Sequence, residues 1–216
     1  MKQLILAGAL AALLAPNRLA AEDVESLHAF HVNLDFKPGW TLQLHARVRT
    51  FEDIGAFNQF RVGPILIWQA KPRFTVLAGY YFTNQHARAL HTSSTVQRLW
   101  SGGQYRVARG ETWSVDARGM LERFIPAGLP EYWRWRNRAM LNKTTRIGEL
   151  YVSGEGLVHR GVWFGQYTSG LKWKVNPRVT LGAGYEYRQT MSGPASHVIG
   201  TYFQWSAYHH VPPHTN

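Results

Sequence analysis

The sequence contains no cysteine among its 216 residues, which excludes a disulfide scaffold, a cysteine nucleophile and a zinc site built on thiolates. Acidic residues are scarce, since 13 Asp and Glu stand against 24 Lys and Arg, for a formal charge of +11. Nine Trp, ten Tyr and ten Phe can bury a sizeable core, so the chain is not a disordered basic tail. So basic a chain ordinarily meets nucleic acid, an anionic membrane surface or acidic ligands, and the direction of the arginines decides among them.

Residues 1–21 have the pattern of a secretory signal rather than of a folded segment. Lys2 precedes an apolar stretch over 4–15, and the small pair Ala20-Ala21 comes before two acidic residues. We expect cleavage after Ala21, because a retained anchor would need a longer apolar span. Later apolar runs, the longest at 62–68, fall short of the ~20 residues of a membrane helix. The sequence therefore predicts an exported chain without spanning helices.

Alternation of apolar and polar residues with period two runs through nearly the whole chain, whereas helical spacing is hard to find. Over 40–50, for example, the even positions up to Val48 are apolar and the odd positions are polar. Tight turns alternate with longer connections, so each interval between tight turns holds one hairpin. We expect one all-β domain over 22–208, an antiparallel up-and-down transmembrane β-barrel, and a flexible His/Pro tail over 209–216. The tight turns are expected at 37–39, 70–72, 108–110, 143–145 and 175–177.

The number of strands lies in the range of about 10–12, because the alternating runs number about eleven. Single-chain bacterial barrels have an even number of strands. Either 23–36 is not a full strand, which leaves ten, or one strand is missing from the count, which gives twelve; we expect twelve. Near the chain end, Phe203, Trp205 and Tyr208 supply alternating aromatics of the kind that the barrel-assembly machinery recognises.

Two closed barrels fit this pattern, and they differ in which face points inward. In a soluble exported barrel that binds an apolar ligand, the apolar face fills the interior; in a bacterial outer-membrane barrel it meets lipid. So many large residues turned inward would leave a large apolar cavity, and aromatics gather near strand ends, as girdles at headgroup level require. We therefore favour the outer membrane as the location. The girdle candidates are Trp40, Trp68, Phe74, Trp113, Trp133, Trp163, Trp173 and Tyr187.

The polar face would then line a lumen in which cations outnumber acids. Ion pairs could fill this lumen and make a narrow barrel rigid. Alternatively, the arginines form a narrow, porin-like channel that prefers small anionic solutes. Neither interpretation requires a cofactor or a metal. The candidates for lining the lumen are Arg47, Arg49, Arg61, Arg98, Arg118, Glu122, Arg134, Arg136, Arg138, Glu149, Glu155, Glu186 and Arg188, and Asp35, Asp116, Lys172 and Lys174 are expected on the same face.

An outer-membrane lipid-modifying enzyme is a less favoured alternative, carried by His91 and Ser93 in one loop. The sequence has no Gly-x-Ser-x-Gly and no carboxylate close by to orient the histidine, so we expect no enzymatic activity. Histidines of the tail, at 209, 210 and 214, are expected to be solvated rather than bound to metal. Arg and Trp in 133–138 fall on opposite strand faces and cannot grip one ligand together, so we expect no nucleic-acid partner.

Several stretches between 30 and 205 resemble an uncharacterised family of short, Arg-rich bacterial outer-membrane barrels, the domain of unknown function 2490. The resemblance implies the fold and the outer-membrane location but supplies no activity. One departure is Gln97, which stands where the family pattern has an acidic residue before Arg98. The matching stretches are Arg61-Val-Gly-Pro-Ile-Leu-Ile-Trp68, Val76-Leu-Ala-Gly-Tyr80, Arg98-Leu-Trp100 with Gln104, Arg118 with Leu121-Glu-Arg123, Trp133-Arg-Trp-Arg-Asn-Arg138 and Leu181-Gly-Ala-Gly-Tyr185.

Overall fold

A computed structural model of the chain describes residues 23–51, 54, 56–87, 92–159, 161–190 and 193–208. The signal segment, the tail and parts of several loops, His91 included, lie outside these residues. In the described part of the chain, no helix is long and apolar enough to span a membrane. The strands are β1 (Asp23–Lys37), β2 (Trp40–Phe51), β3 (Ala56–Lys71), β4 (Phe74–Ala87), β5 (Thr92–Arg109), β6 (Trp113–Pro126), β7 (Tyr132–Thr145), β8 (Gly148–His159), β9 (Val162–Lys174), β10 (Val179–Thr190) and β11 (Gly193–Tyr208).

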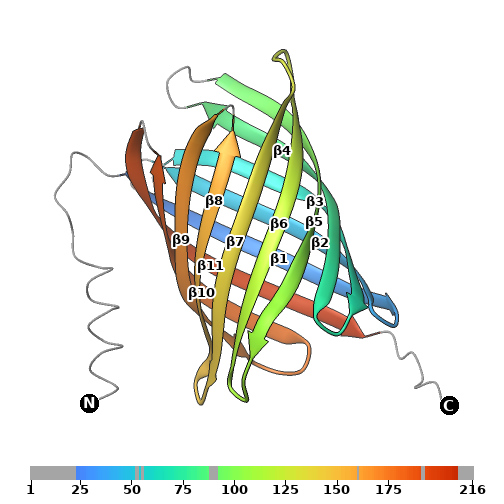
Figure 1. Ribbon diagram of the computed structural model, residues 1–216. Coiled ribbons are helices and arrows are strands. Elements are labelled where there is room, and N and C mark those ends of the chain that lie inside the picture. Colours follow the sequence, from blue (N-terminus) through green and yellow to red (C-terminus); the bar gives the residue numbers. More distant parts are fainter. Residues whose placement is uncertain are drawn as a thin grey trace.

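These eleven strands close into one barrel (Figure 1). Each strand pairs antiparallel with the next strand along the chain, whereas β1 and β11 pair in parallel. An odd number of strands, each reversing the one before, leaves the first and the last running the same way, so the seam between them has to be parallel. The predicted all-β closed barrel of about 10–12 strands is therefore confirmed, whereas the preference for twelve strands within that range is wrong. The segment at 23–37 is a full strand with a partner on each side.

The two ends of the barrel differ in their connections. Tight turns join β1 to β2, β3 to β4, β5 to β6, β7 to β8 and β9 to β10 at the end that lies below in Figure 1. In the first of them Gly39 has a φ of +76°, in the left-handed region that favours glycine. The other connections, most of them longer, lie at the opposite end. We call the two ends the tight-turn end and the loop end; β1 begins at the loop end and β11 finishes at the tight-turn end.

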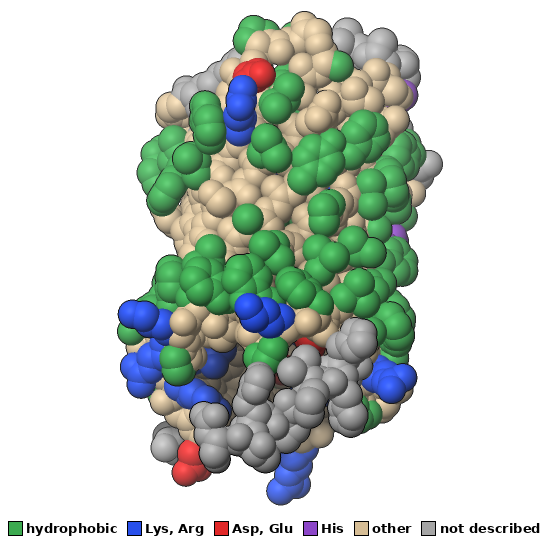
Figure 2. All heavy atoms as spheres, turned by 90° about the vertical axis from the view of Figure 1, so that its right-hand side faces the viewer, with side chains coloured by type: hydrophobic (Ala, Val, Ile, Leu, Met, Phe, Trp, Pro, Cys, Tyr) green, Lys and Arg blue, Asp and Glu red, His purple; other side chains and the backbone are tan. Residues whose placement is uncertain are grey.

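Alternation along each strand separates an apolar outer face from a largely polar lumen. On β3, Leu66 is 38% exposed while its neighbour Ile65 is 7% exposed, and on β2 Leu44 is 46% exposed. Figure 2 shows hydrophobic side chains spread over one side of the barrel. This arrangement is the reverse of a soluble barrel with an apolar interior.

A small apolar core packs inside the barrel rather than outside it. The cluster consists of Ile65, Leu77, Tyr81, Trp100 and Met120, contributed by four neighbouring strands. Glycine makes room for the largest of these side chains, because a Cβ at Gly79 would lie 2.5 Å from the Trp100 indole. The lumen is therefore partly filled by rings, with polar groups on either side of them.

Candidate functional site in the lumen

Strand register places the lumen candidates on one continuous inner face. Arg47 of β2 lies opposite Arg61 of β3, and Glu122 of β6 lies opposite Arg134 of β7. Every second residue of a strand points to the same face, and residues directly opposite each other on paired strands also share a face. One inward-facing residue therefore identifies the inward-facing residues of the neighbouring strands around the barrel. All the candidates from Arg47 to Arg188 that the sequence singled out fall on this face.

Glu122 is the centre of the largest ion-pair network in the described residues. Its carboxylate is fully buried and lies 2.5 Å from Arg134 Nε, 3.2 Å from Arg98 Nη1 and 3.3 Å from Arg136 Nη1. Arg136 also donates from Nε to Glu155 Oε1 at 2.6 Å. Three guanidinium groups from β5 and β7 thus surround one carboxylate that is shielded from water. Their ion pairs link the neighbouring strands β5, β6 and β7 on the lumen face.

The surroundings of Arg98 show the effect of the departure at Gln97 from the family pattern. Gln97 faces outward, where its side chain accepts a hydrogen bond from the Tyr80 hydroxyl at 3.3 Å. Arg98 faces inward and obtains its carboxylate from Glu122 on the adjacent strand. The missing acid at position 97 therefore costs the lumen no ion pair.

Other ion pairs show where reasoning from sequence was incomplete. Glu25 pairs with Arg49, and Arg106 pairs with Asp116 at 3.1 Å; neither Glu25 nor Arg106 was among the candidates. Arg106 lies an even number of residues after Arg98, and Glu25 lies an even number of residues before His31. Extending the alternation along each strand would therefore have placed both side chains in the lumen. The remaining candidate carboxylates are also occupied, since Glu149 pairs with Lys172 and Glu186 pairs with Arg188. Lys174, in contrast, is exposed at the end of β9.

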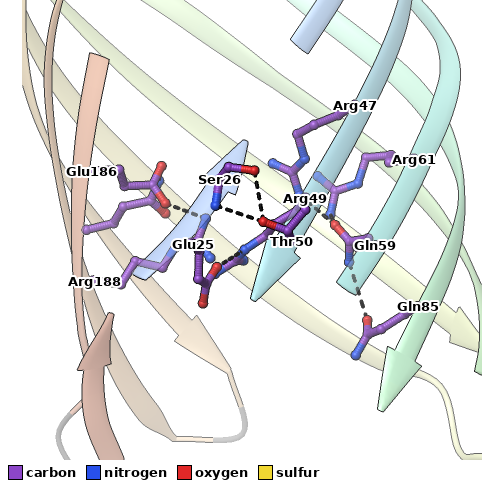
Figure 3. Close-up of polar contacts among 11 residues, drawn as sticks. Glu25, Ser26, Arg47, Arg49, Thr50, Gln59, Arg61, Gln85, Glu186 and Arg188 are labelled. Carbon is purple, nitrogen blue, oxygen red and sulfur yellow. Dashed lines mark hydrogen bonds and ion pairs between the residues drawn. The ribbon is translucent and has the colours of Figure 1, made fainter. Parts of the chain in front are cut away.

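A cavity of about 390 Å³ lies in the half of the lumen near the loop end. Arginines from five strands line it, together with glutamines and a few rings. Figure 3 shows one wall, where side chains of β2 and β3 converge on Gln59. The cavity therefore presents mainly hydrogen-bond donors with positive charge. Its arginines are Arg47, Arg49, Arg61, Arg98, Arg134, Arg136 and Arg188.

An arc of five rings narrows the lumen between this cavity and the tight-turn end. Tyr202 lies 4.9 Å from His31, His31 lies 4.8 Å from His45, and His45 lies 5.1 Å from Tyr81, as measured between ring centroids. Tyr81 stacks on Trp100 at 5.6 Å. We call these five residues the ring arc. Anything that crosses the lumen has to pass it.

The girdle candidates all lie on the outer face, near the two ends of the strands. Trp40 stacks on Trp68 with centroids 5.1 Å apart near the tight-turn end, and Trp133 is 56% exposed near the loop end. Trp163 and Trp173 mark both rims on the single strand β9. Their separation is ~34 Å along the strand, or ~24–28 Å along the axis of a barrel with the usual strand tilt of 35–45°.

A collar of cations surrounds the tight-turn end. Every described Lys or Arg that is exposed lies in these turns or at the adjoining strand ends, and most of the cations visible in Figure 2 gather at that end. Among the described residues of these turns, the exposed acidic side chain is that of Glu111, so cations outnumber acids at this end. We call this set the basic collar: Lys37, Lys71, Arg73, Arg109, Lys143, Arg146, Lys174 and Arg178.

The residues of the enzyme alternative are described only in part. His91 is outside the described residues. The Ser93 hydroxyl oxygen, on β5, lies 3.3 Å from Nδ1 of His86, which is on the outer face of β4. Within the described chain, no carboxylate forms a hydrogen bond with His86, so no acidic side chain there orients its ring. No cluster of metal-ligating side chains occurs in the same part of the chain. The tail histidines lie beyond it.

Residues 26–198 match the family described as "Protein of unknown function (DUF2490)", and this range covers well over half of the chain. The chain belongs to this family. The resemblance drawn from its motifs is thereby confirmed. Neither the curated proteins nor the solved structures contain a match to the chain. Because the DUF2490 family has no assigned function, the residues themselves have to support any proposal of activity.

Proposed function

We propose that this DUF2490 protein is an integral barrel of the bacterial outer membrane, with a lumen that admits small anions. The outer face carries the first part of the proposal, because exposed Leu, Val, Phe and Trp side chains cover the strands. Water would meet this surface at a high cost in free energy, whereas lipid tails would not. The soluble alternative requires the opposite orientation of the two faces.

The two rims support the same proposal. The axial distance of ~24–28 Å between Trp163 and Trp173 agrees with the apolar band of ≈ 25 Å in outer-membrane barrels. The basic collar lies at one rim, at a level where it would meet the phosphates of lipid headgroups. Short turns face the periplasm in such barrels and longer loops face outward. The basic collar would then lie on the periplasmic side.

The lumen carries the second part of the proposal. Arginines crowd the cavity, and four lumen arginines have no ion pair among the described residues: Arg47, Arg61, Arg118 and Arg138. A passage lined with surplus fixed cations attracts anions and repels cations. Because the ring arc narrows the path, we expect conductance to be small as well as anion-selective.

Two measurements test these two parts separately. Membrane fractionation followed by gel electrophoresis with and without heating tests the location, because folded outer-membrane barrels migrate differently from their heated form. Recovery of the chain in the periplasmic soluble fraction would contradict the outer-membrane assignment. Reversal potentials of the purified protein in planar bilayers under a KCl gradient test selectivity; a preference for K⁺, or no conductance at all, would contradict the anion passage.

A further inference from the structure

Arg47 and Arg61 form a like-charged pair on one wall of the cavity. They lie directly opposite each other on β2 and β3, where two cations repel. Gln59 Oε1 accepts a hydrogen bond from Arg47 Nη2 at 2.7 Å and another from Arg61 Nη2 at 3.1 Å (Figure 3). The buried Nε atom of each arginine has no hydrogen-bond partner in the part of the chain that the structure describes. A neutral amide is therefore the hydrogen-bond acceptor that the two arginines share, and neither of them has an ion-paired carboxylate among the described residues.

The other arginines of the cavity have carboxylates. Arg49 pairs with Glu25, Arg188 pairs with Glu186, and Glu122 serves the three on β5 and β7. Among the described residues, the cavity arginines without any carboxylate partner are thus those on the wall formed by β2 and β3. Buried charge without a counter-charge is costly, so this wall is suited to an anion from outside the chain.

We propose that Arg47 and Arg61 bind the phosphate group of a small soluble molecule. Two guanidinium forks offer parallel N–H donors, and a tetrahedral dianion can accept from both and balance both charges, whereas a monocarboxylate balances one. Tyr81 backs the site, with its ring centroid 5.4 Å from Arg61 Cζ. The cavity of about 390 Å³ exceeds a phosphate and leaves space for the organic part of the molecule.

The location of the pair favours a soluble molecule over a lipid headgroup. Arg47 and Arg61 face the lumen, and the sheet separates them from the outer apolar face. The proposal specifies the anion class of the proposed lumen function, and it rests on that function in taking the lumen as the route of entry. Binding can nevertheless be measured on protein in detergent, where neither membrane location nor conductance enters.

The test is thermal unfolding of the full-length folded protein in neutral detergent, with inorganic phosphate replacing chloride at constant ionic strength. We expect the unfolding midpoint to rise by roughly 5–10 °C at a hundredfold excess over Kd. Arg47→Gln and Arg61→Gln should each abolish this rise. In phosphate-free buffer both variants should unfold at a higher temperature than the wild type, because each removes a buried cation that has no ion pair among the described residues. General damage to the fold would lower the midpoint instead.

Arg123→Gln is the matched control, because Arg123 faces outward near the loop end and pairs with the exposed Glu131. Its phosphate response should equal that of the wild type. The proposal would be overturned if the unfolding midpoint did not change when phosphate replaces chloride. It would also be overturned if the rise in phosphate persisted in Arg47→Gln and Arg61→Gln. A second arm uses mixed micelles with phosphatidylglycerol in place of phosphate. Protection in that arm alone would assign the site to a lipid headgroup and overturn the soluble ligand.

Discussion

Arg134 Nε lies 2.5 Å from Glu122 Oε2 on the inner face of the barrel, where Glu122 is fully buried. Glu122→Gln would leave three guanidinium groups facing one neutral amide. We expect the free energy of unfolding to fall by about 3–5 kcal/mol, as when one partner of a buried ion pair is removed. Unfolding of the refolded protein by guanidinium chloride in detergent measures this change. Glu131→Gln is the control, since its exposed pair with Arg123 should contribute below about 1 kcal/mol; equal effects of the two substitutions would show that Glu122 does not organise the lumen.

A residue near the middle of the apolar band tests whether the outer face meets lipid. Leu44, on the outer face of β2 four residues from Trp40 of the tight-turn rim, lies closer to the middle of the apolar band, so Leu44→Arg should cost about 2–4 kcal/mol when the chain folds into lipid vesicles. Val175→Arg, in the tight turn after β9, should cost roughly 0–1 kcal/mol because it lies beyond the apolar band. Folding yields in vesicles of defined thickness, read from the heat-dependent gel shift, provide the comparison. A fully folded Leu44→Arg variant with unchanged stability would speak against lipid contact.

Lys71 and Arg73 test the role of the basic collar. Replacing both with Gln should weaken binding to vesicles that contain phosphatidylglycerol by about 2 kcal/mol, or roughly thirtyfold, at ~1 kcal/mol for each charge near an anionic surface. Vesicle sedimentation of the protein before insertion measures the affinity. The difference should disappear in neutral phosphatidylcholine vesicles and shrink at high salt. If both vesicle types bind the variant and the wild type alike, the collar has no lipid partner.

Trp100 tests whether the ring arc limits passage. Trp100→Ala removes the indole that stacks on Tyr81 and covers Gly79, so single-channel conductance should rise. Planar-bilayer recording compares it with Trp113→Ala, which removes an exposed indole from the outer face. The gel shift on heating shows whether each variant is folded. A folded Trp100→Ala variant with the conductance of the wild type would place the constriction elsewhere.

Ser93 tests the enzyme alternative. Its 3.3 Å contact with His86 lacks a described carboxylate that would orient the ring, so we expect no hydrolysis of phospholipid esters that depends on this serine. Release of fatty acid from mixed micelles should be the same for the wild type and for Ser93→Ala. A loss of hydrolysis in the folded variant would instead establish a lipid-modifying activity at the outer rim.

Period-two alternation was sufficient to predict which face each strand residue takes, as the inward positions of Arg134, Arg136 and Arg138 on β7 illustrate. Alternation is local, and it does not contain the pairing between strands. The Glu122 carboxylate for Arg98 therefore could not be predicted, because register sets that contact. The alternating runs also predict about eleven strands, which is correct. The preference for twelve is wrong because it rests on the even number typical of other barrels, whereas this chain closes through a parallel seam.

The parallel seam between β1 and β11 also decides where the two ends of the fold emerge. A barrel with an even number of strands returns the chain to the side from which it set out. With eleven strands, Asp23 and Tyr208 lie at opposite ends of the barrel. A label attached before Asp23 and one attached after Tyr208 would therefore report two different sides of the apolar belt, and no short linker could join the two ends into a circular permutant.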